Sequence, residues 1–203
     1  MRAQSEVLIP RVDGRRARGE RTRLKVLESL LSLLEEGQLR PTAQQVAEHA
    51  GVALRTVYHH FDDVEALRHT ALSLQLSRSQ KIFEDIDPAL PLEERARQYA
   101  RQCRRLFEAI TPIRRAALMD ESNHEAMPPD LAEIIHRRRE QLEATFASEL
   151  SQRGAVSRDL VDATDAGSSW LTWYFLRYEL GRSAPATERV FATTIVELLQ
   201  PRR

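Results

Sequence analysis

Apolar residues recur at three- and four-residue spacing along almost the whole chain, and no alternating strand pattern continues for long. Such spacing indicates amphipathic helices. In residues 18–36 the apolar stripe consists of Leu24, Leu27, Leu31 and Leu34. Gly37 then ends the pattern. The chain is therefore expected to be all-α, with about nine helices and no sheet.

Capping residues, glycines and prolines mark the ends of the other predicted helices. Thr42, with Gln45 three residues later, predicts a capping box at the start of a short helix that Gly51 ends. Asp62 with Glu65 predicts a second capping box. The remaining helices are predicted over residues 54–61, about 62–86, 92–110, 112–119, 130–153, 157–180 and 186–199.

Composition places the chain among ordinary soluble proteins. Its 203 residues are 42% hydrophobic and 30% charged. The single cysteine, Cys103, excludes an internal disulfide and a Cys-pair zinc site, and a free thiol fits a reducing compartment. No apolar run approaches the roughly 20 residues that span a bilayer, and no secretory signal is present. The expectation is a cytoplasmic protein without a membrane span.

Positive charge is concentrated near the start of the chain, although 30 basic and 30 acidic residues cancel overall. The basic cluster consists of Arg11, Arg15, Arg16, Arg18, Arg21, Arg23 and Lys25. Only Asp13 and Glu20 oppose it. A localised basic segment on a balanced chain is typical of an electrostatic contact with nucleic acid. Residues 1–17 are therefore interpreted as a basic flexible arm, and a solvated tail is the alternative.

The three helices predicted within residues 18–63 have the pattern of a helix-turn-helix. Gly51 allows the tight turn, and Val52 supplies the apolar residue that follows it. Val57 and Phe61 are expected to pack on Val46, Ala47 and Ala50. The exposed face of the second helix would then carry Arg55, Thr56, Tyr58, His59 and His60. None is acidic, and such a helix fits a major groove about 12 Å wide. A purely structural corner is the alternative.

The segment from Arg23 to Leu67 carries a longer pattern as well. It reads Val46-Ala47-x-x-Ala50-Gly51-Val52-x-x-Arg55-Thr56-Val57-Tyr58-x-His60-Phe61, followed by Glu65-Ala66-Leu67 and preceded by Gly37-x-x-x-x-Thr42. This pattern resembles the signature of the TetR family of bacterial repressors. The resemblance implies a homodimeric repressor that binds a near-palindromic DNA operator and is released by a small-molecule effector. It implies a DNA-binding domain over residues 18–63 and an effector-binding and dimerisation domain over residues 64–203.

Two positions depart from the family pattern. The family usually has Ser or Thr two residues after the glycine, where this chain has Ala53. A missing helix cap costs roughly 0.5–2 kcal/mol. The family often has a phosphate-binding Lys three residues after the Phe, where this chain has Val64. One phosphate contact fewer predicts a slightly shallower dependence of DNA affinity on salt.

The matching positions of the second helix receive their roles from the resemblance. Arg55 is expected to make a bidentate contact with guanine. Thr56 would meet phosphate or a thymine methyl group. Tyr58 and His60 would contact the DNA backbone, and His59 a base or a sugar.

Further DNA contacts are expected outside that helix. Thr42 can offer its amide and hydroxyl to a phosphate at a helix N-terminus, and Gln44 would reach a base or phosphate. Arg15, Arg16 and Arg18 would enter a neighbouring minor groove, as flexible basic arms do.

The segment over residues 157–180 combines small residues with a heavy aromatic load. Aromatic residues lie almost all around it, so more than one face is expected to be buried. The resemblance implies that one face joins the last helix in a four-helix dimer interface. The predicted interface residues are Ala163, Gly167, Trp170, Val190, Thr194 and Leu198. The alternative is that both faces belong to the core of a single chain.

An apolar stripe elsewhere in the body is the candidate effector pocket. It consists of Tyr99, Cys103 and Phe107, with Trp173 and Tyr174 expected to face it. A mostly apolar pocket would suit a hydrophobic or aromatic ligand. Plain core is the alternative for the stripe, and a small buried thiol is the expected state of Cys103. The helix over residues 62–86 would link effector binding to the DNA-binding domain.

Other polar clusters carry no clear chemistry. The loop with Asp120, Glu121, His124 and Glu125 is interpreted as a polar surface loop, not a metal site. Residues 137–139, three consecutive arginines, are interpreted as a solvated helix face. No enzyme motif is present, and no cofactor is expected. Two other functions stay open, namely a ligand-binding or enzymatic protein whose head no longer binds DNA, and a regulator controlled by a protein partner.

Overall fold

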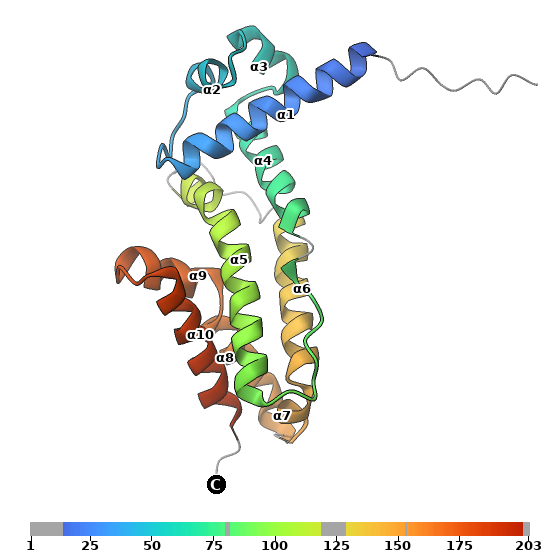
Figure 1. Ribbon diagram of the computed structural model, residues 1–203, viewed down its shortest axis with the longest axis vertical. Helices are drawn as coiled ribbons and strands as arrows, with labels where there is room; N and C mark the ends of the chain where they lie inside the picture. The colour runs from blue at the N-terminus through green and yellow to red at the C-terminus, as the bar shows by residue number, and fades with distance from the viewer. Residues whose placement is uncertain (1–13, 80–81, 119–128, 153, 201–203) are drawn as a thin grey trace, which may run out of the picture. The chain divides into compact units, whose positions relative to one another are not determined.

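The computed structural model describes residues 14–79, 82–118, 129–152 and 154–200, and all regular structure within these ranges is helical. The prediction of an all-α fold is therefore confirmed. The chain divides into two compact units, Met1–Ala71 and Leu72–Arg203 (Figure 1). The boundary falls within helix α4 (Val64–Ser79), whereas the sequence predicted it before Val64. No helix in the described ranges has the length and apolarity needed to cross a membrane.

Unit 1 is built on α1 (Gly14–Glu35), with α2 (Ala43–Ala50) and α3 (Leu54–His60) packed against it (Figure 1). The buried face of α1 consists of Val26, Leu27, Leu30, Leu31, Leu33 and Leu34. Leu24 was predicted on this stripe but is 38% exposed. Residues 14–17, predicted as part of a flexible arm, belong to α1. Residues 1–13 of that predicted arm lie outside the described residues.

The start of α4 corrects the second predicted capping box. The Asp63 carboxylate, not that of Asp62, accepts a hydrogen bond from the Ala66 amide at 2.7 Å. Glu65 is the second residue after Asp63, not the third, and its carboxylate pairs with Arg68 at 3.0 Å and His69 at 3.3 Å. The helix ends at Ser79, well before the predicted end at residue 86.

Unit 2 is a helical body. Its helices are α5 (Leu92–Leu118), α6 (Pro129–Thr145), α7 (Ala147–Ser151), α8 (Ser157–Gly167), α9 (Trp170–Tyr174) and α10 (Ala184–Leu199). A 3-10 turn, η2 (Gly154–Val156), precedes α8, and a π-helical turn, η3 (Phe175–Glu179), extends α9. Figure 1 shows α5 between α6 and α10. The pair α5 and α10 packs over the greatest length.

Three predicted helices in unit 2 have different limits in the structure. Residues 92–118 form one helix where the sequence predicted two, because Ile113 and Ala116 continue the buried face of α5 beyond Pro112. The predicted helix over residues 130–153 is interrupted after α6. There the fully buried Phe146 packs edge-on against Tyr99, with 5.9 Å between their ring centroids.

The predicted helix over residues 157–180 breaks between α8 and α9. The Ser169 hydroxyl accepts a hydrogen bond from the Thr172 amide at 3.3 Å and so caps α9. Gly167 lies where α8 and α10 approach closely, since a Cβ atom at this position would sit 2.9 Å from the Thr194 Cγ2 atom. The small residue therefore serves packing within one chain.

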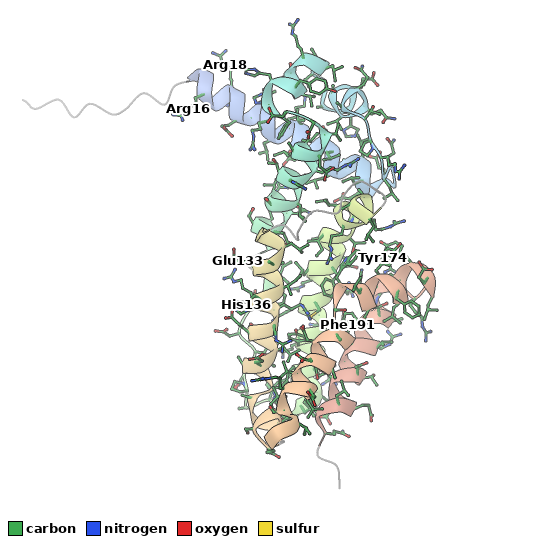
Figure 2. All side chains as sticks on the ribbon, turned by 180° about the vertical axis from the view of Figure 1, so that it is seen from behind. Arg16, Arg18, Glu133, His136, Tyr174 and Phe191 are labelled. Carbon is green, nitrogen blue, oxygen red and sulfur yellow. The ribbon has the colours of Figure 1, made fainter. Side chains whose placement is uncertain are left out.

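An aromatic cluster fills the centre of unit 2. Phe107 of α5, Trp173 of α9 and Phe191 of α10 are at most 2% exposed, and their ring centroids lie 6.1–6.3 Å apart. Phe191 is labelled on α10 in Figure 2. Burial of three large aromatic side chains gives this unit a substantial apolar core.

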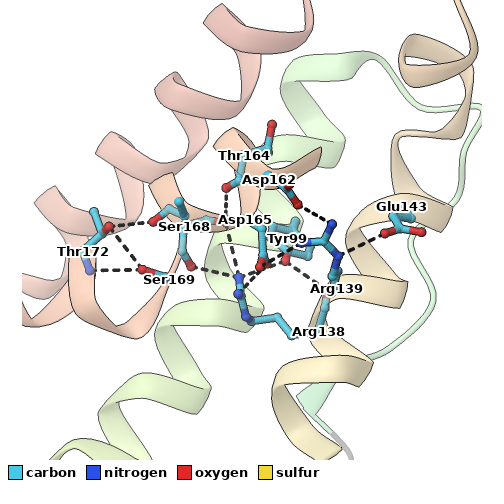
Figure 3. Close-up of polar contacts among 11 residues, drawn as sticks. Tyr99, Arg138, Arg139, Glu143, Asp162, Thr164, Asp165, Ser168, Ser169 and Thr172 are labelled. Carbon is cyan, nitrogen blue, oxygen red and sulfur yellow. Dashed lines mark hydrogen bonds and ion pairs between the residues drawn. The ribbon is translucent and has the colours of Figure 1, made fainter. Parts of the chain in front are cut away.

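A buried arginine links α6 to α5 and α8 (Figure 3). The Arg138 guanidinium donates to the Asp165 carboxylate at 2.5 Å and to the Ser168 carbonyl at 3.2 Å. The Tyr99 hydroxyl donates to the Arg138 carbonyl at 3.1 Å. Arg138 is only 4% exposed, so the prediction of a solvated face is wrong at this position. Neighbouring Arg137 is exposed, as predicted.

Candidate nucleic-acid interface

The turn between α2 and α3 has the predicted geometry. Thr42 and Gln45 form the predicted capping box, with the Thr42 amide donating to Gln45 Oε1 at 2.8 Å and the Gln45 amide donating to Thr42 Oγ1 at 3.2 Å. Gly51 adopts φ of 60°, a left-handed conformation that glycine takes without steric cost. The Val52 amide then donates to the Ala47 carbonyl at 2.9 Å, which closes α2.

The inner face of α3 is fixed by packing. Val57 is 2% exposed and Phe61 is 5% exposed. The α2 residues buried with them are Val46, Ala47 and Ala50, as predicted. Arg23 of α1, which was counted only as part of the basic segment, stacks over Phe61 with its guanidinium carbon 5.3 Å from the ring centroid. These contacts determine which side of α3 remains available.

The outer face of α3 carries the five predicted DNA contacts. Arg55 and His59 are exposed, and Tyr58 is 52% exposed. Thr56 and His60 are half-buried. All five side chains are therefore at least partly accessible to solvent, on a helix whose opposite face is packed against unit 1. Their contacts with DNA stay a prediction.

The N-terminus of α3 is uncapped. Ala53 occupies the capping position in an extended conformation, with φ of −71° and ψ of 147°, and it makes no side-chain hydrogen bond. This is the backbone geometry in which a serine hydroxyl accepts an amide hydrogen bond one turn ahead. The departure seen in the sequence therefore removes a cap without disturbing the helix itself.

Replacing Ala53 by serine is expected to stabilise unit 1 by about 0.5–2 kcal/mol, because the new hydroxyl can accept a free amide of α3. Thermal unfolding followed by circular dichroism measures the change. Thr42→Ala is the matched comparison, since it removes the cap that α2 does have and should lower stability by a similar amount. An Ala53→Ser variant that melts at or below the wild-type temperature would contradict the prediction.

The predicted contacts on α1 and α2 lie in different environments. The Gln44 side-chain amide donates to Glu48 Oε1 at 2.6 Å, so one of its two N–H donors is already engaged. Arg16 and Arg18 are exposed on the first turns of α1 and are labelled in Figure 2. Arg15 belongs to the same helix, not to a flexible arm. Arg16 and Arg18 therefore extend from a helix, whereas the sequence predicted that they enter a minor groove as part of a flexible arm.

Two adjacent histidines, His59 and His60, lie at the C-terminal end of α3. Their rings lie edge to face with 5.2 Å between centroids. Partial burial lowers the pKa of His60 below its ordinary value, and the positive charges of His59 and Arg23 lower it further, against an opposing effect of Glu20. His60 is therefore mainly neutral at neutral pH in the free protein.

DNA affinity is expected to rise as pH falls from 8 to 6. A DNA backbone beside His60 favours the charged imidazole, so binding takes up a proton and is strengthened where protons are abundant. The folded state alone has the opposite dependence, because a lowered His60 pKa makes unfolding easier below about pH 6.5. Binding titrations at several pH values test this, with His60→Gln expected to flatten the dependence. A His60→Gln profile as steep as that of wild type would count against it.

The predicted effector residues fall into two groups in unit 2. Tyr99, Cys103, Phe107 and Trp173 are at most 2% exposed and belong to the packed core. Burial raises the pKa of Cys103 to about 11, so this thiol is protonated at neutral pH. Tyr174 is half-buried and stacks with other aromatic residues. A surface cavity of about 890 Å³ lies elsewhere, lined by Arg139, Glu143, Ala147, Leu150, Gly154, Ser157, Arg158, Asp159 and Val161.

The predicted interface residues also differ in exposure. Ala163 of α8 is exposed. Gly167, Val190, Thr194 and Leu198 are half-buried. Trp170 is only 4% exposed, and its indole N–H donates to the Thr111 hydroxyl at 3.0 Å. Trp170 therefore packs within its own chain.

Within the described ranges, no three His, Cys, Asp or Glu side chains lie together in a group that could hold a metal ion. The polar loop with Asp120, Glu121, His124 and Glu125 lies outside the described residues.

A solved structure resembles most of this chain. It is described as a "putative TetR-family transcriptional regulator" from Mesorhizobium loti MAFF303099, and the match has a TM-score of 0.54 and 18% sequence identity over 90% of this chain and 96% of that one. The chain has that regulator's fold. No protein-family model and no curated protein sequence matches it. The TetR-type fold joins a helix-turn-helix head to a helical body, which is the architecture predicted from the sequence.

Proposed function

We propose that this chain is a sequence-specific DNA-binding transcriptional regulator of the TetR type that acts as a homodimeric repressor. The outer face of α3 is the observation that supports it, because Arg55, Tyr58 and His59 are accessible while Val57 anchors the helix. Arg55 would read guanine, and Tyr58 and His60 would hold the register on the phosphate backbone. The description of the structural neighbour supports the same role.

A two-fold symmetric protein would read a near-palindromic operator with two such heads. Ala163 of α8, with Val190, Thr194 and Leu198 of α10, would supply the subunit interface, since these side chains are at least partly exposed in the single chain. A small molecule bound to the body would release the operator if it binds the DNA-incompetent state more tightly.

A second candidate function is a helical ligand-binding or enzymatic protein whose head has lost DNA binding. The uncapped start of α3 at Ala53 favours it, because a missing cap costs the helix that would read DNA about 0.5–2 kcal/mol of stability.

Selection of bound fragments from a random DNA library, at about 0.15 M salt, tests the proposal. Wild type is compared with Tyr58→Ala, which removes a 52% exposed side chain and should leave the fold intact. Enrichment of an inverted repeat by wild type, weakened in the variant, supports a dimeric reader of DNA sequence. Enrichment of a single half-site would contradict the dimer, and no enrichment would favour the second candidate function.

A further inference from the structure

Three aromatic rings of one helical face form a ladder beside the C-terminal part of α5. The aromatic ladder consists of Trp170, Tyr174 and Tyr178. Successive ring centroids are 5.4 Å and 5.3 Å apart, and the ring planes are inclined by 34° and 29°. Tyr174, the middle ring of the ladder, is labelled in Figure 2. The rings are thus close to parallel, with offsets that favour stacking.

Two consecutive arginines of α5 cover the ends of the ladder. The guanidinium carbon of Arg114 lies 3.8 Å from the ring centroid of Trp170. That of Arg115 lies 4.2 Å from the ring centroid of Tyr178. A guanidinium stacked on a ring keeps its N–H donors at the edge of the plane, where they can bind a carboxylate.

The charges of these two arginines are not balanced as those of several other arginines in unit 2 are. Arg95 pairs with Glu149, Arg104 with Glu188 and Arg138 with Asp165. Within the described part of the chain, neither Arg114 nor Arg115 has a carboxylate or carbonyl partner. Burial lowers the pKa of Arg114 to about 10, which expresses the cost of holding this cation away from water. An anion bound there would offset that cost.

Apolar surface adjoins the two cations. Leu118, one turn after Arg114, is 58% exposed, and Tyr178 is 41% exposed. Along the same helical segment as the ladder, Leu171 is 67% exposed and Phe175 is 51% exposed. Exposed apolar side chains near a desolvated cation suit a ligand that combines a negative group with a flat apolar body.

We propose that this face binds a planar aromatic carboxylate, with its carboxylate held by the positive charges of Arg114 and Arg115 and its ring against the exposed apolar side chains beside the aromatic ladder. The site is distinct from the buried stripe of Tyr99, Cys103 and Phe107. Its assignment as the effector site rests on the proposed function, whereas binding itself does not.

Calorimetric titration with 2-naphthoate and the neutral isostere 2-naphthamide tests the site. Naphthoate should bind saturably, one per chain, and at least ten times more tightly than naphthamide. Arg114→Gln and Arg115→Gln should each lower the affinity for naphthoate at least tenfold. Arg97→Gln is the matched control, because Arg97 lies on the same helix but pairs with Glu94, and it should bind naphthoate as wild type does.

Two further measurements keep the test decisive. Arg114→Lys preserves the charge but loses the planar donor edge, so it should melt near the wild-type temperature and still bind naphthoate more weakly. Inorganic phosphate should compete poorly, since it lacks an aromatic body. Equal binding of naphthoate and naphthamide, equal competition by phosphate, or unchanged binding in Arg114→Gln would each overturn the proposal. A fourth result would also overturn it: wild type does not bind naphthoate, and Arg114→Gln loses self-association in sedimentation experiments. The arginines would then contact a second copy of the chain.

The two proposals fail separately. Titrations with naphthoate need no DNA, and the DNA selection needs no ligand. A chain that enriches no DNA but binds naphthoate through Arg114 would contradict the regulator and leave the site standing. A chain that enriches an inverted repeat but does not bind naphthoate would contradict the site alone.

Discussion

Replacing Arg138 by alanine is expected to lower the free energy of unfolding of unit 2 by about 3–5 kcal/mol. The side chain is 4% exposed and holds Asp165 at 2.5 Å and the Ser168 carbonyl at 3.2 Å. Alanine leaves the Asp165 carboxylate with only the more distant cation Arg139, whose Nη1 lies 3.6 Å from Asp165 Oδ2, and leaves the Ser168 carbonyl without that donor. Losing the closer partner of a largely buried charge costs far more than losing a surface ion pair, which is worth about 0–1 kcal/mol.

Arg137→Ala supplies the matched control, because the neighbouring side chain is exposed and its loss should change stability by no more than about 0.5 kcal/mol. Urea unfolding followed by tryptophan fluorescence measures both variants. The two tryptophans of the chain, Trp170 and Trp173, lie in unit 2, so the signal reports the unit in question. Coincident unfolding midpoints for the two variants would show that the buried network contributes nothing.

The contrast between Arg137 and Arg138 also shows what the sequence could not reveal. Three consecutive arginines on a charge-rich helix give no local sign that one of them turns inward. The burial of Arg138 depends on Asp165, 27 residues away, and on Tyr99, 39 residues away. Hydrophobic periodicity describes one helix at a time and contains no information about such partners.

The head could be predicted because its signals are local. Capping by Thr42, the positive φ of Gly51 and the burial of Val57 and Phe61 each follow from residues within a few positions. The same locality explains a small error. Asp62 and Asp63 are adjacent and chemically alike, and only the path of the chain decides that Asp63 caps α4.

The limits of the helices in unit 2, and the packing of its candidate effector pocket, were harder to predict from the sequence. Ser169 caps α9 in the middle of what reads as one continuous helix, and Phe146 interrupts another because the core accepts its ring. An apolar stripe such as Tyr99, Cys103 and Phe107 has the same spacing whether it lines a cavity or is packed solid. Packing is a property of the facing elements, here α9 and α10 with Trp173 and Phe191.

Replacing Arg55 by alanine is expected to abolish most of the sequence discrimination of the proposed regulator. A bidentate contact with guanine is worth about 1–3 kcal/mol of discrimination, and a two-fold dimer makes it twice, so the loss should be about 2–6 kcal/mol. Fold stability should barely change, because Arg55 is exposed and the anchors of α3, Val57 and Phe61, are untouched. Fluorescence anisotropy with the selected operator and a scrambled duplex measures the difference.

Two variants separate reading of bases from attraction to phosphate. Arg55→Lys keeps the positive charge but cannot form the two-pronged contact, so it should lose discrimination while the dependence of affinity on salt stays nearly unchanged. Arg16→Ala removes an exposed charge on the first turns of α1 and should weaken the operator and the scrambled duplex by the same factor. If Arg55→Ala also lowers the affinity for both duplexes by the same factor, Arg55 is a phosphate contact. Another residue of the outer face of α3 must then read the bases.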